Sequence, residues 1–241
     1  NHLKISENKV NFIDHATGHA AYAYFSKKKK LKKTLVLTLD AFGDHINYSA
    51  KLFTILKNGK LEIKNIVKGN DFIIGRLYRY ITLILGLKPN EHEYKVMGLA
   101  PYCKKEYYNS VENIFKSFQD VKKLVFYDKN KPKDLYFDVK KKLEGFRFDA
   151  IAGGLQSYTE YLICKWVKFI VKKYKVNSIC YAGGVAMNVK ANLYISSLKK
   201  KINLYVPPSP DDSSQAMGAC YGYYLLKKKN LNKLKPLENA Y

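Results

Sequence analysis

Two histidines stand four residues apart near the start of the chain, at His15 and His19. In a helix this spacing places both imidazoles on one face, one turn apart, so that their nitrogens can bind a single ion. The pair is not the H-E-x-x-H motif of zinc proteases, because Ala16 occupies the position of the glutamate base. A metal site is one interpretation of the pair, and two unrelated histidines on a helix face is the other.

Two aspartates could complete such a site. Asp40 and Asp212 each follow an apolar segment that is typical of a strand, so a sheet could bring both carboxylates to one crevice. Asp212 has a second interpretation, because the segment 210–214 precedes a predicted helix and resembles an N-cap. The two roles are compatible if one carboxylate oxygen caps the helix and the other binds the ion.

A glycine turn forms a second candidate site. Gly183 and Gly184 lie in the segment Ala182-Gly183-Gly184-Val185-Ala186-Met187-Asn188, between a predicted strand and a predicted helix. Glycines let the backbone approach a nucleotide, and the N-terminus of a helix offers N–H groups to an anion. The turn at 40–44, with Gly43 and Asp44, could face the phosphates from the other side. For both segments, a turn without a ligand is the alternative.

Lys95 is a third candidate. It lies in the segment 91–102, where charged residues lead into an apolar stretch closed by Pro101. Its ammonium could contact a phosphate or a carbonyl oxygen. The chain contains many lysines, so a solvated side chain is the alternative.

The elements that must position these residues follow from the apolar periodicity. Strands are expected where apolar residues alternate, and helices where they recur at steps of three and four. Asn58-Gly59 predicts a tight hairpin, so the first three strands should form an antiparallel meander. In chain order we expect strands at 35–39, 46–56 and 60–67, helices at 71–87 and from 149, a strand at 177–181, a helix to about 201, a strand at 202–206 and a helix at 213–228.

Three further expectations concern local structure. Residues 10–13 have the pattern of a strand, and the segment after them that carries the histidine pair is predicted to be helical. Asp149 is expected to cap the long helix, and Gly153-Gly154 within it predicts a close approach of another backbone. Residues 103–142 have weak periodicity and are interpreted as an insertion.

This order of strands and helices predicts a layered α/β domain. It is similar to the ribonuclease-H-like half of the actin, hexokinase and Hsp70 superfamily. On that basis, residues 1–33 are the end of a first subdomain with the histidine helix. Residues 34–241 are a second actin-like subdomain with a helical insertion at about 71–148. Because the first residue is Asn1, we expect the chain to begin part-way through a larger protein.

Composition narrows the class of protein. The 241 residues are 47% hydrophobic, which excludes a disordered chain. The longest apolar run, 72–87, is interrupted by Arg76 and Arg79, so no membrane span is expected. The four cysteines are far apart and form no C-x-x-C motif, which favours a reducing cytoplasm.

The net charge of +23 raises the possibility of nucleic-acid binding. However, only three of the 43 basic residues are arginine, the residue best suited to reading bases and to bidentate phosphate contacts. The lysine runs are scattered along the chain. Solvated lysine faces are therefore favoured, and no specific nucleic-acid partner is expected.

Taken together, five motifs resemble the NodU/CmcH-type O-carbamoyltransferases over about residues 10–225. The histidine pair and the last aspartate are shared with the related TsaD and HypF proteins. The motifs are Asp14-His15-x-x-x-His19-Ala20, Thr38-Leu39-Asp40-x-x-Gly43-Asp44, the segment Glu91–Tyr102, the segment Ala182–Asn192, and Asp212-x-x-x-Ala216-x-Gly218-Ala219.

The resemblance implies an ATP-dependent enzyme that makes carbamoyl adenylate from carbamoyl phosphate and passes the carbamoyl group to a substrate hydroxyl. His15, His19 and Asp212 would hold a divalent metal, iron, with Asp40 as a fourth ligand. A metal that polarises the carbamoyl oxygen would stabilise the charge that develops as the hydroxyl attacks.

The resemblance also implies ligand contacts. Gly183, Gly184 and Asn188 would line the adenylate site, and Lys95 would contact the carbamoyl phosphate portion. Two family features are expected outside this chain: the opening strands and a C-terminal YrdC-like domain that makes the adenylate. We therefore expect the isolated chain not to turn over carbamoyl phosphate.

Three residues depart from the family pattern, and two other classes of function remain as alternatives. Ser214 and Gln215 stand where the family commonly has glycines after the metal aspartate, and Cys103 stands where a glycine is expected. A superfamily ATPase or kinase-like domain would keep the nucleotide turns without needing the histidine pair. A non-catalytic basic binding module would use only the lysine-rich surface.

Overall fold

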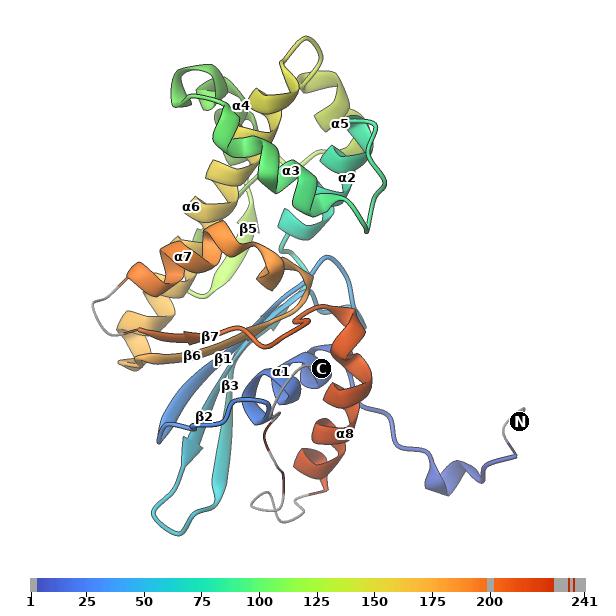
Figure 1. Ribbon diagram of the computed structural model, residues 1–241, viewed down its shortest axis with the longest axis vertical. Coiled ribbons are helices and arrows are strands. Elements are labelled where there is room, and N and C mark those ends of the chain that lie inside the picture. The colour runs from blue at the N-terminus through green and yellow to red at the C-terminus, as the bar shows by residue number, and fades with distance from the viewer. Residues whose placement is uncertain (1–3, 199–201, 228–233, 235, 237–241) are drawn as a thin grey trace.

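The computed structural model describes residues 4–198, 202–227, 234 and 236. Among them, five strands form one mixed sheet in the order β3-β2-β1-β6-β7 (Figure 1). The strands of this sheet are β1 (Lys33–Leu39), β2 (Tyr48–Ile55), β3 (Leu61–Gly69), β6 (Ser178–Ala182) and β7 (Asn203–Tyr205).

The pairing of the strands confirms the predicted meander. β1, β2 and β3 are antiparallel neighbours, and Gly59 takes φ +76° in the turn between β2 and β3. β6 joins β1 in parallel, and β7 joins β6 in parallel. Because β1 and β6 are parallel neighbours, the segments that follow their carboxyl ends start at the same edge of the sheet.

Helices cover both faces of the sheet (Figure 1). On the α1 face, α1 (His15–Phe25) and α8 (Gln215–Leu226) lie side by side. On the α6 face, α6 (Phe148–Tyr174) packs with the larger core. Successive residues of β1 alternate between the two, since Leu35 and Leu37 belong to the core with α6 and Val36 belongs to the core with α1.

The remaining α-helices and a two-stranded sheet belong to the α6 side. The weakly patterned segment 103–142 is ordered, because the apolar residues of three separate elements join the larger core. They are α4 (Lys105–Phe118), the hairpin of β4 (Gln119–Lys122) and β5 (Val125–Asp128), and α5 (Leu135–Lys142). Two other helices are α2 (Ile74–Ile84) and α3 (Glu93–Leu99), and α7 (Val189–Ser197) follows β6. Short 3-10 turns are η1 (Glu7–Lys9), η2 (Ala100–Tyr102), η3 (Gly184–Met187) and η4 (Asp212–Ser214).

The glycine pair of α6 has the predicted role. A Cβ atom on Gly154 would lie 2.6 Å from Val111 Cγ1 and 2.9 Å from the backbone nitrogen of Glu112, so α4 approaches α6 closely here. The predicted cap of α6 is wrong, because the helix begins earlier and Arg147 is its N-cap. Asp149 instead accepts hydrogen bonds from the Arg147 guanidinium inside the first turn.

The predicted strand at 10–13 is also wrong. These residues are extended but lie beside no strand among the described residues, so they form no ladder. Val10 and Phe12 are exposed, and only Ile13 contacts α8, at Gly222.

Helices on both faces of a mixed sheet confirm the predicted α/β class. The relation to the actin, hexokinase and Hsp70 superfamily and the division at residue 33 stay predictions. Within the described ranges, no helix has both the length and the apolar character that a membrane crossing requires.

Candidate metal centre

The histidine pair lies at the start of α1, as its spacing predicts. The Asp14 carboxylate caps the helix by accepting a hydrogen bond from the Thr17 backbone N–H. His15 and His19 then project from one side of the helix, with their Nε2 atoms 3.1 Å apart. His19 is 1% exposed, whereas His15 is half-buried.

Two carboxylates meet this pair. Asp40 follows the last residue of β1, and its Oδ2 lies 3.0 Å from the Nε2 atom of each histidine. Asp212 opens η4, and its Oδ1 lies 3.2 Å from both Nε2 atoms. All four donor atoms lie within 4.8 Å of one another. The structure therefore brings together the four residues that the sequence analysis proposed as metal ligands.

Hydrogen bonds at the sheet edge orient Asp40 and the backbone of His15. Asp40 Oδ1 accepts the Ala41 N–H at 2.7 Å, which leaves Oδ2 directed at the imidazoles. Asp44 Oδ2 accepts the His15 backbone N–H at 2.8 Å and so fixes the first turn of α1. Gly43 lies against the His15 ring, because a Cβ atom there would be 2.2 Å from His15 Cδ2.

The close packing of α8 on α1 positions Asp212. A Cβ atom on Gly218 would lie 2.5 Å from the Gly18 carbonyl oxygen, so the two backbones are nearly in contact. Gln215, in the first turn of α8, donates to the His15 carbonyl oxygen at 3.2 Å. The alternative interpretation of Asp212 as a cap is wrong, because Asp211 is the N-cap of η4, Ser214 is that of α8, and neither helix has a side-chain cap bond.

The carboxylates and imidazoles shift one another's pKa values. Hydrogen bonds to Asp212 and then Asp40 raise the pKa of His15 to about 10. For His19, burial is the largest effect and lowers the pKa, but the hydrogen bonds to Asp212 and Asp40 outweigh it and leave the pKa raised. The two histidines hold the pKa of Asp212 well below its usual range. The carboxylates therefore favour proton binding by each imidazole, and the imidazoles favour the charged form of Asp212.

The donor set fits a divalent cation. Two imidazole nitrogens and two carboxylate oxygens suit several first-row divalent ions. Separations of 3.0 to 3.2 Å between the donor atoms are compatible with neighbouring ligands that share one ion. Asp212 keeps one side of the cluster open, since its side chain is 69% exposed.

The predicted glycine turn lies beside the cluster. Gly183 takes φ +95°, and a Cβ atom there would be 2.2 Å from the Leu39 carbonyl oxygen, so a side chain is excluded. A Cβ atom on Gly184 would lie 3.2 Å from Asp40 Oδ1. The backbone N–H groups of Gly184 and Val185 donate to no other group in the part of the chain that the structure describes. The turn therefore offers two N–H donors next to the four acidic and imidazole groups.

Asn188 is placed differently from the glycines. Its side-chain nitrogen donates to the Tyr78 hydroxyl at 3.1 Å and to Gln156 Oε1 at 2.9 Å. Its oxygen accepts from Gln156 Nε2 at 3.0 Å and caps α7 by accepting the Ala191 N–H at 2.9 Å. The side chain is buried in this network between α2, α6 and α7, and its contact with a nucleotide stays a prediction.

Lys95 is not part of the cluster. It lies on the exposed side of α3, with its ammonium 5.8 Å from the centre of the Tyr94 ring. Its contact with carbamoyl phosphate stays a prediction. The phosphate role of Gly43 and Asp44 also stays a prediction, because their contacts here are with His15.

The sequence analysis missed the residues that hold the two helices together. Gly18 and Gly218 permit the contact between α1 and α8, and Gln215 bridges it. Two glycines four residues apart, Gly218 and Gly222, mark a helix face that can approach another backbone, and this spacing could have identified the contact.

The fold and the cluster define an α/β protein with a four-donor candidate centre at the carboxyl edge of its sheet. Comparison with known families gives a match that covers most of the chain. A family model described as carbamoyltransferase N-terminus matches residues 2–221. The chain therefore belongs to the carbamoyltransferase N-terminus family, as its motifs predict.

Three curated relatives are longer proteins to which this chain is similar over part of their length. It is 30% identical over 241 residues to the uncharacterized protein MJ1051 of Methanocaldococcus jannaschii. This alignment covers 95% of this chain and 45% of MJ1051. It is 31% identical to the uncharacterized protein MJ1058 of the same organism, over 99% of this chain and 41% of the relative. Nodulation protein NolNO of Sinorhizobium fredii is 22% identical over 98% of this chain and 34% of its own length. The chain thus spans less than half the length of these relatives.

Proposed function

We propose that this chain is the metal-dependent core of an O-carbamoyltransferase. It would pass a carbamoyl group from carbamoyl adenylate, made from carbamoyl phosphate and ATP, to the hydroxyl of a small-molecule acceptor. The observation that carries the proposal is the convergence of His15, His19, Asp40 and Asp212, whose donor atoms lie within 4.8 Å of one another. Membership of the carbamoyltransferase family supports the group that is transferred.

The four donors would hold one divalent ion, for which we propose iron. Each histidine would bind through Nε2, and each aspartate through one oxygen. The two carboxylates balance the charge of a divalent ion in a site where His19 and Asp40 are buried. When bound, the ion would polarise the carbamoyl oxygen and so stabilise negative charge on it.

Other residues would position the reactants. Asp44 holds the backbone of His15, and Ala41 orients the Asp40 carboxylate. The free N–H groups of Gly184 and Val185 would bind phosphate oxygens of the adenylate, because their orientation is fixed by the turn before the substrate arrives. This places the proposed anion contact next to the proposed ion.

A metal titration tests the proposal. The purified chain is stripped of metal and titrated anaerobically with Fe(II), and binding is followed by calorimetry and metal analysis. We expect one ion per chain, and a rise in the unfolding temperature because the ion binds only the folded state. The double variant His15→Ala/His19→Ala should lose the binding.

His92→Ala is the control, since His92 lies outside the cluster of four donors. Its ring accepts a hydrogen bond from the Lys88 backbone N–H in an exposed loop. It should bind Fe(II) as the unchanged chain does. Equal binding by the double variant and the control would contradict the proposal. An ATPase or kinase-like domain would instead keep ATP affinity in the double variant without any dependence on the ion, so an ATP titration of each protein separates these two classes.

A further inference from the structure

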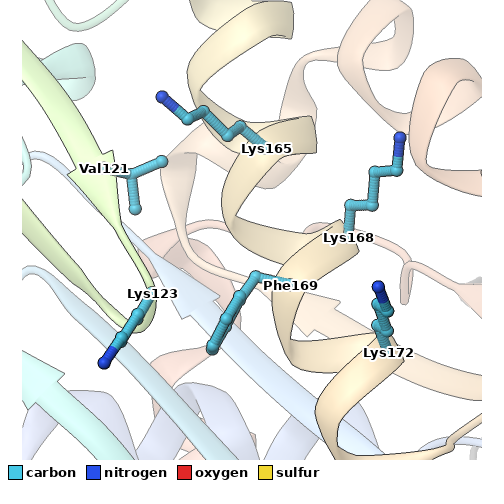
Figure 2. Close-up of a pocket in the computed structure, with 6 residues that line it drawn as sticks. All are labelled: Val121, Lys123, Lys165, Lys168, Phe169 and Lys172. Carbon is cyan, nitrogen blue, oxygen red and sulfur yellow. The ribbon is translucent and has the colours of Figure 1, made fainter.

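A pocket lies on the α6 side of the sheet, away from the candidate metal centre. It has a volume of about 250 Å³ and opens between the β4–β5 hairpin and the outer side of α6. Figure 2 shows the Phe169 ring pointing from α6 toward Lys123 of the hairpin. The residues that line the pocket are Val121, Lys123, Lys165, Lys168, Phe169 and Lys172.

Four lysines border this pocket, whose lining is mostly apolar. Lys165 is paired with Asp120, whose Oδ1 lies 2.7 Å from the ammonium. Within the described part of the chain, Lys123, Lys168 and Lys172 form no ion pair with a carboxylate. Lys168 lies three residues from Lys165 and four from Lys172, so like charges repel one another along the helix. An anion in or beside the pocket would relieve this repulsion.

Two aromatic residues, Tyr161 and Phe169, lie on the same helix as Lys165, Lys168 and Lys172. Tyr161 and Phe169 are eight residues apart on α6, which is about 12 Å along the same side of the helix. Tyr161 is 37% exposed, and its ring centre lies 5.1 Å from the Lys116 ammonium and 5.2 Å from that of Lys165. Phe169 is partly exposed at the pocket. The surface therefore combines cations with flat apolar faces.

This combination selects among anionic ligands. An acidic polypeptide supplies carboxylates but no regular series of planar rings. A single nucleic-acid strand supplies phosphates and unpaired bases, which stack on aromatic side chains with little sequence preference. Lysine, a point charge, suits backbone contacts better than base reading. The net charge of +23 adds attraction at longer range.

We infer that the α6 basic face, formed by Lys123, Tyr161, Lys168, Phe169 and Lys172, binds single-stranded nucleic acid without sequence preference. Phosphates would contact the three lysines that lack a carboxylate partner, and a base would stack on Phe169. This binding is independent of the proposed carbamoyl transfer. Because α1 and α6 cover opposite faces of the sheet, the strand would not occupy the metal centre.

Fluorescence anisotropy with a labelled oligouridylate of about 12 nucleotides tests the inference on the full chain. Affinity is measured over about 0.1 to 0.3 M salt. The variant Lys168→Glu/Lys172→Glu should weaken binding about tenfold or more and lower the slope of log affinity against log salt by about 1.4, which is about 0.7 for each lost phosphate contact. Lys28→Glu/Lys29→Glu changes the net charge equally at two exposed lysines after α1, and should have a smaller effect.

Phe169→Leu separates stacking from charge. It keeps the net charge and most of the apolar volume, so the salt slope should stay constant while affinity falls about tenfold through lost stacking. Circular dichroism establishes that each variant is folded. Unlabelled oligouridylate should displace the probe, whereas uridine monophosphate and polyglutamate at the same concentration of charge should not.

Four results would overturn the inference. Equal weakening by the two charge-reversal variants would mean that only the general lysine field attracts the strand. An unchanged affinity of Phe169→Leu would exclude stacking at the pocket. Displacement by the mononucleotide would assign the pocket to a free nucleotide, and displacement by polyglutamate would assign it to an acidic polypeptide.

Discussion

The two faces of the sheet differ in what packs at their centres and in which of them carries the candidate metal centre. On the α1 face, small residues let backbones approach, so that α8 lies against α1 at Gly18 and Gly218. On the α6 face, large rings fill the core, with Trp166 packed 5.3 Å from Phe126 and 5.9 Å from Tyr48 between ring centres. All four candidate metal ligands lie at the edge of the α1 face. Close backbone contacts position them, whereas the larger core supplies most of the buried apolar surface.

Removing a large ring from the core of the α6 face should destabilise the protein. Trp166 is fully buried and donates a hydrogen bond to the Leu124 carbonyl oxygen at 2.8 Å. Trp166→Ala should lower the free energy of unfolding by about 3 to 5 kcal/mol, through the cavity and the lost bond. Urea denaturation measures this loss. The folded fraction should still bind Fe(II) normally, and lost ion binding in folded protein would show that the faces are not independent.

Adding one methyl group should disturb the α1 face. In Gly218→Ala the new Cβ would lie 2.5 Å from a backbone oxygen that cannot move alone, so α8 must shift. Overpacking of this kind should cost about 1 to 3 kcal/mol. Because α8 follows Asp212 directly, Fe(II) affinity should fall as well, as calorimetry would detect. A variant with unchanged affinity would mean that helix packing does not position the ligand.

Gly43→Ala should affect the metal centre more than stability. The added Cβ would lie 2.2 Å from the His15 ring, which must turn away from Asp40. We expect Fe(II) affinity to fall about 10- to 100-fold, the range seen when the supports of metal ligands are altered. The unfolding free energy should change little, because Gly43 is partly exposed in a loop. Unchanged binding would contradict this prediction.

Gly98→Ala is the contrasting substitution, with the smallest expected effect. Gly98 lies in α3 with no atom within 4 Å of the new Cβ and with no strained backbone. Alanine should raise the free energy of unfolding by about 0.5 to 1 kcal/mol through helix propensity. Comparing its urea midpoint with that of Gly218→Ala isolates the effect of close packing from that of replacing glycine in a helix.

Local geometry explains which predictions succeed. The spacing of His15 and His19 determines their common side as soon as a helix forms. Asp40 could be placed because it follows a strand whose parallel neighbour ends at the same edge. Asp212 has two reasonable interpretations in the sequence, and only the local geometry, in which Asp211 and Ser214 are the N-caps, separates them.

Predictions that depend on distant partners are less complete. The network around Asn188 needs Tyr78 and Gln156, which come from two other helices and carry no sequence pattern that links them. The hairpin 119–128 is hidden within the weakly patterned segment because its two strands are only four residues each. The apolar residues at 10–13 resemble a strand, but a strand needs a neighbour, which the sequence does not reveal.

The long separation of the ligands along the chain determines when the centre can assemble during synthesis. The His15–His19 pair is synthesised before Asp40 and Asp212, and Asp212 follows His19 by 193 positions. A nascent chain that has not reached η4 presents only three of the four donors. The complete four-donor site would thus form only after α8 has docked on α1, and an ion that is held firmly would report that this packing is complete.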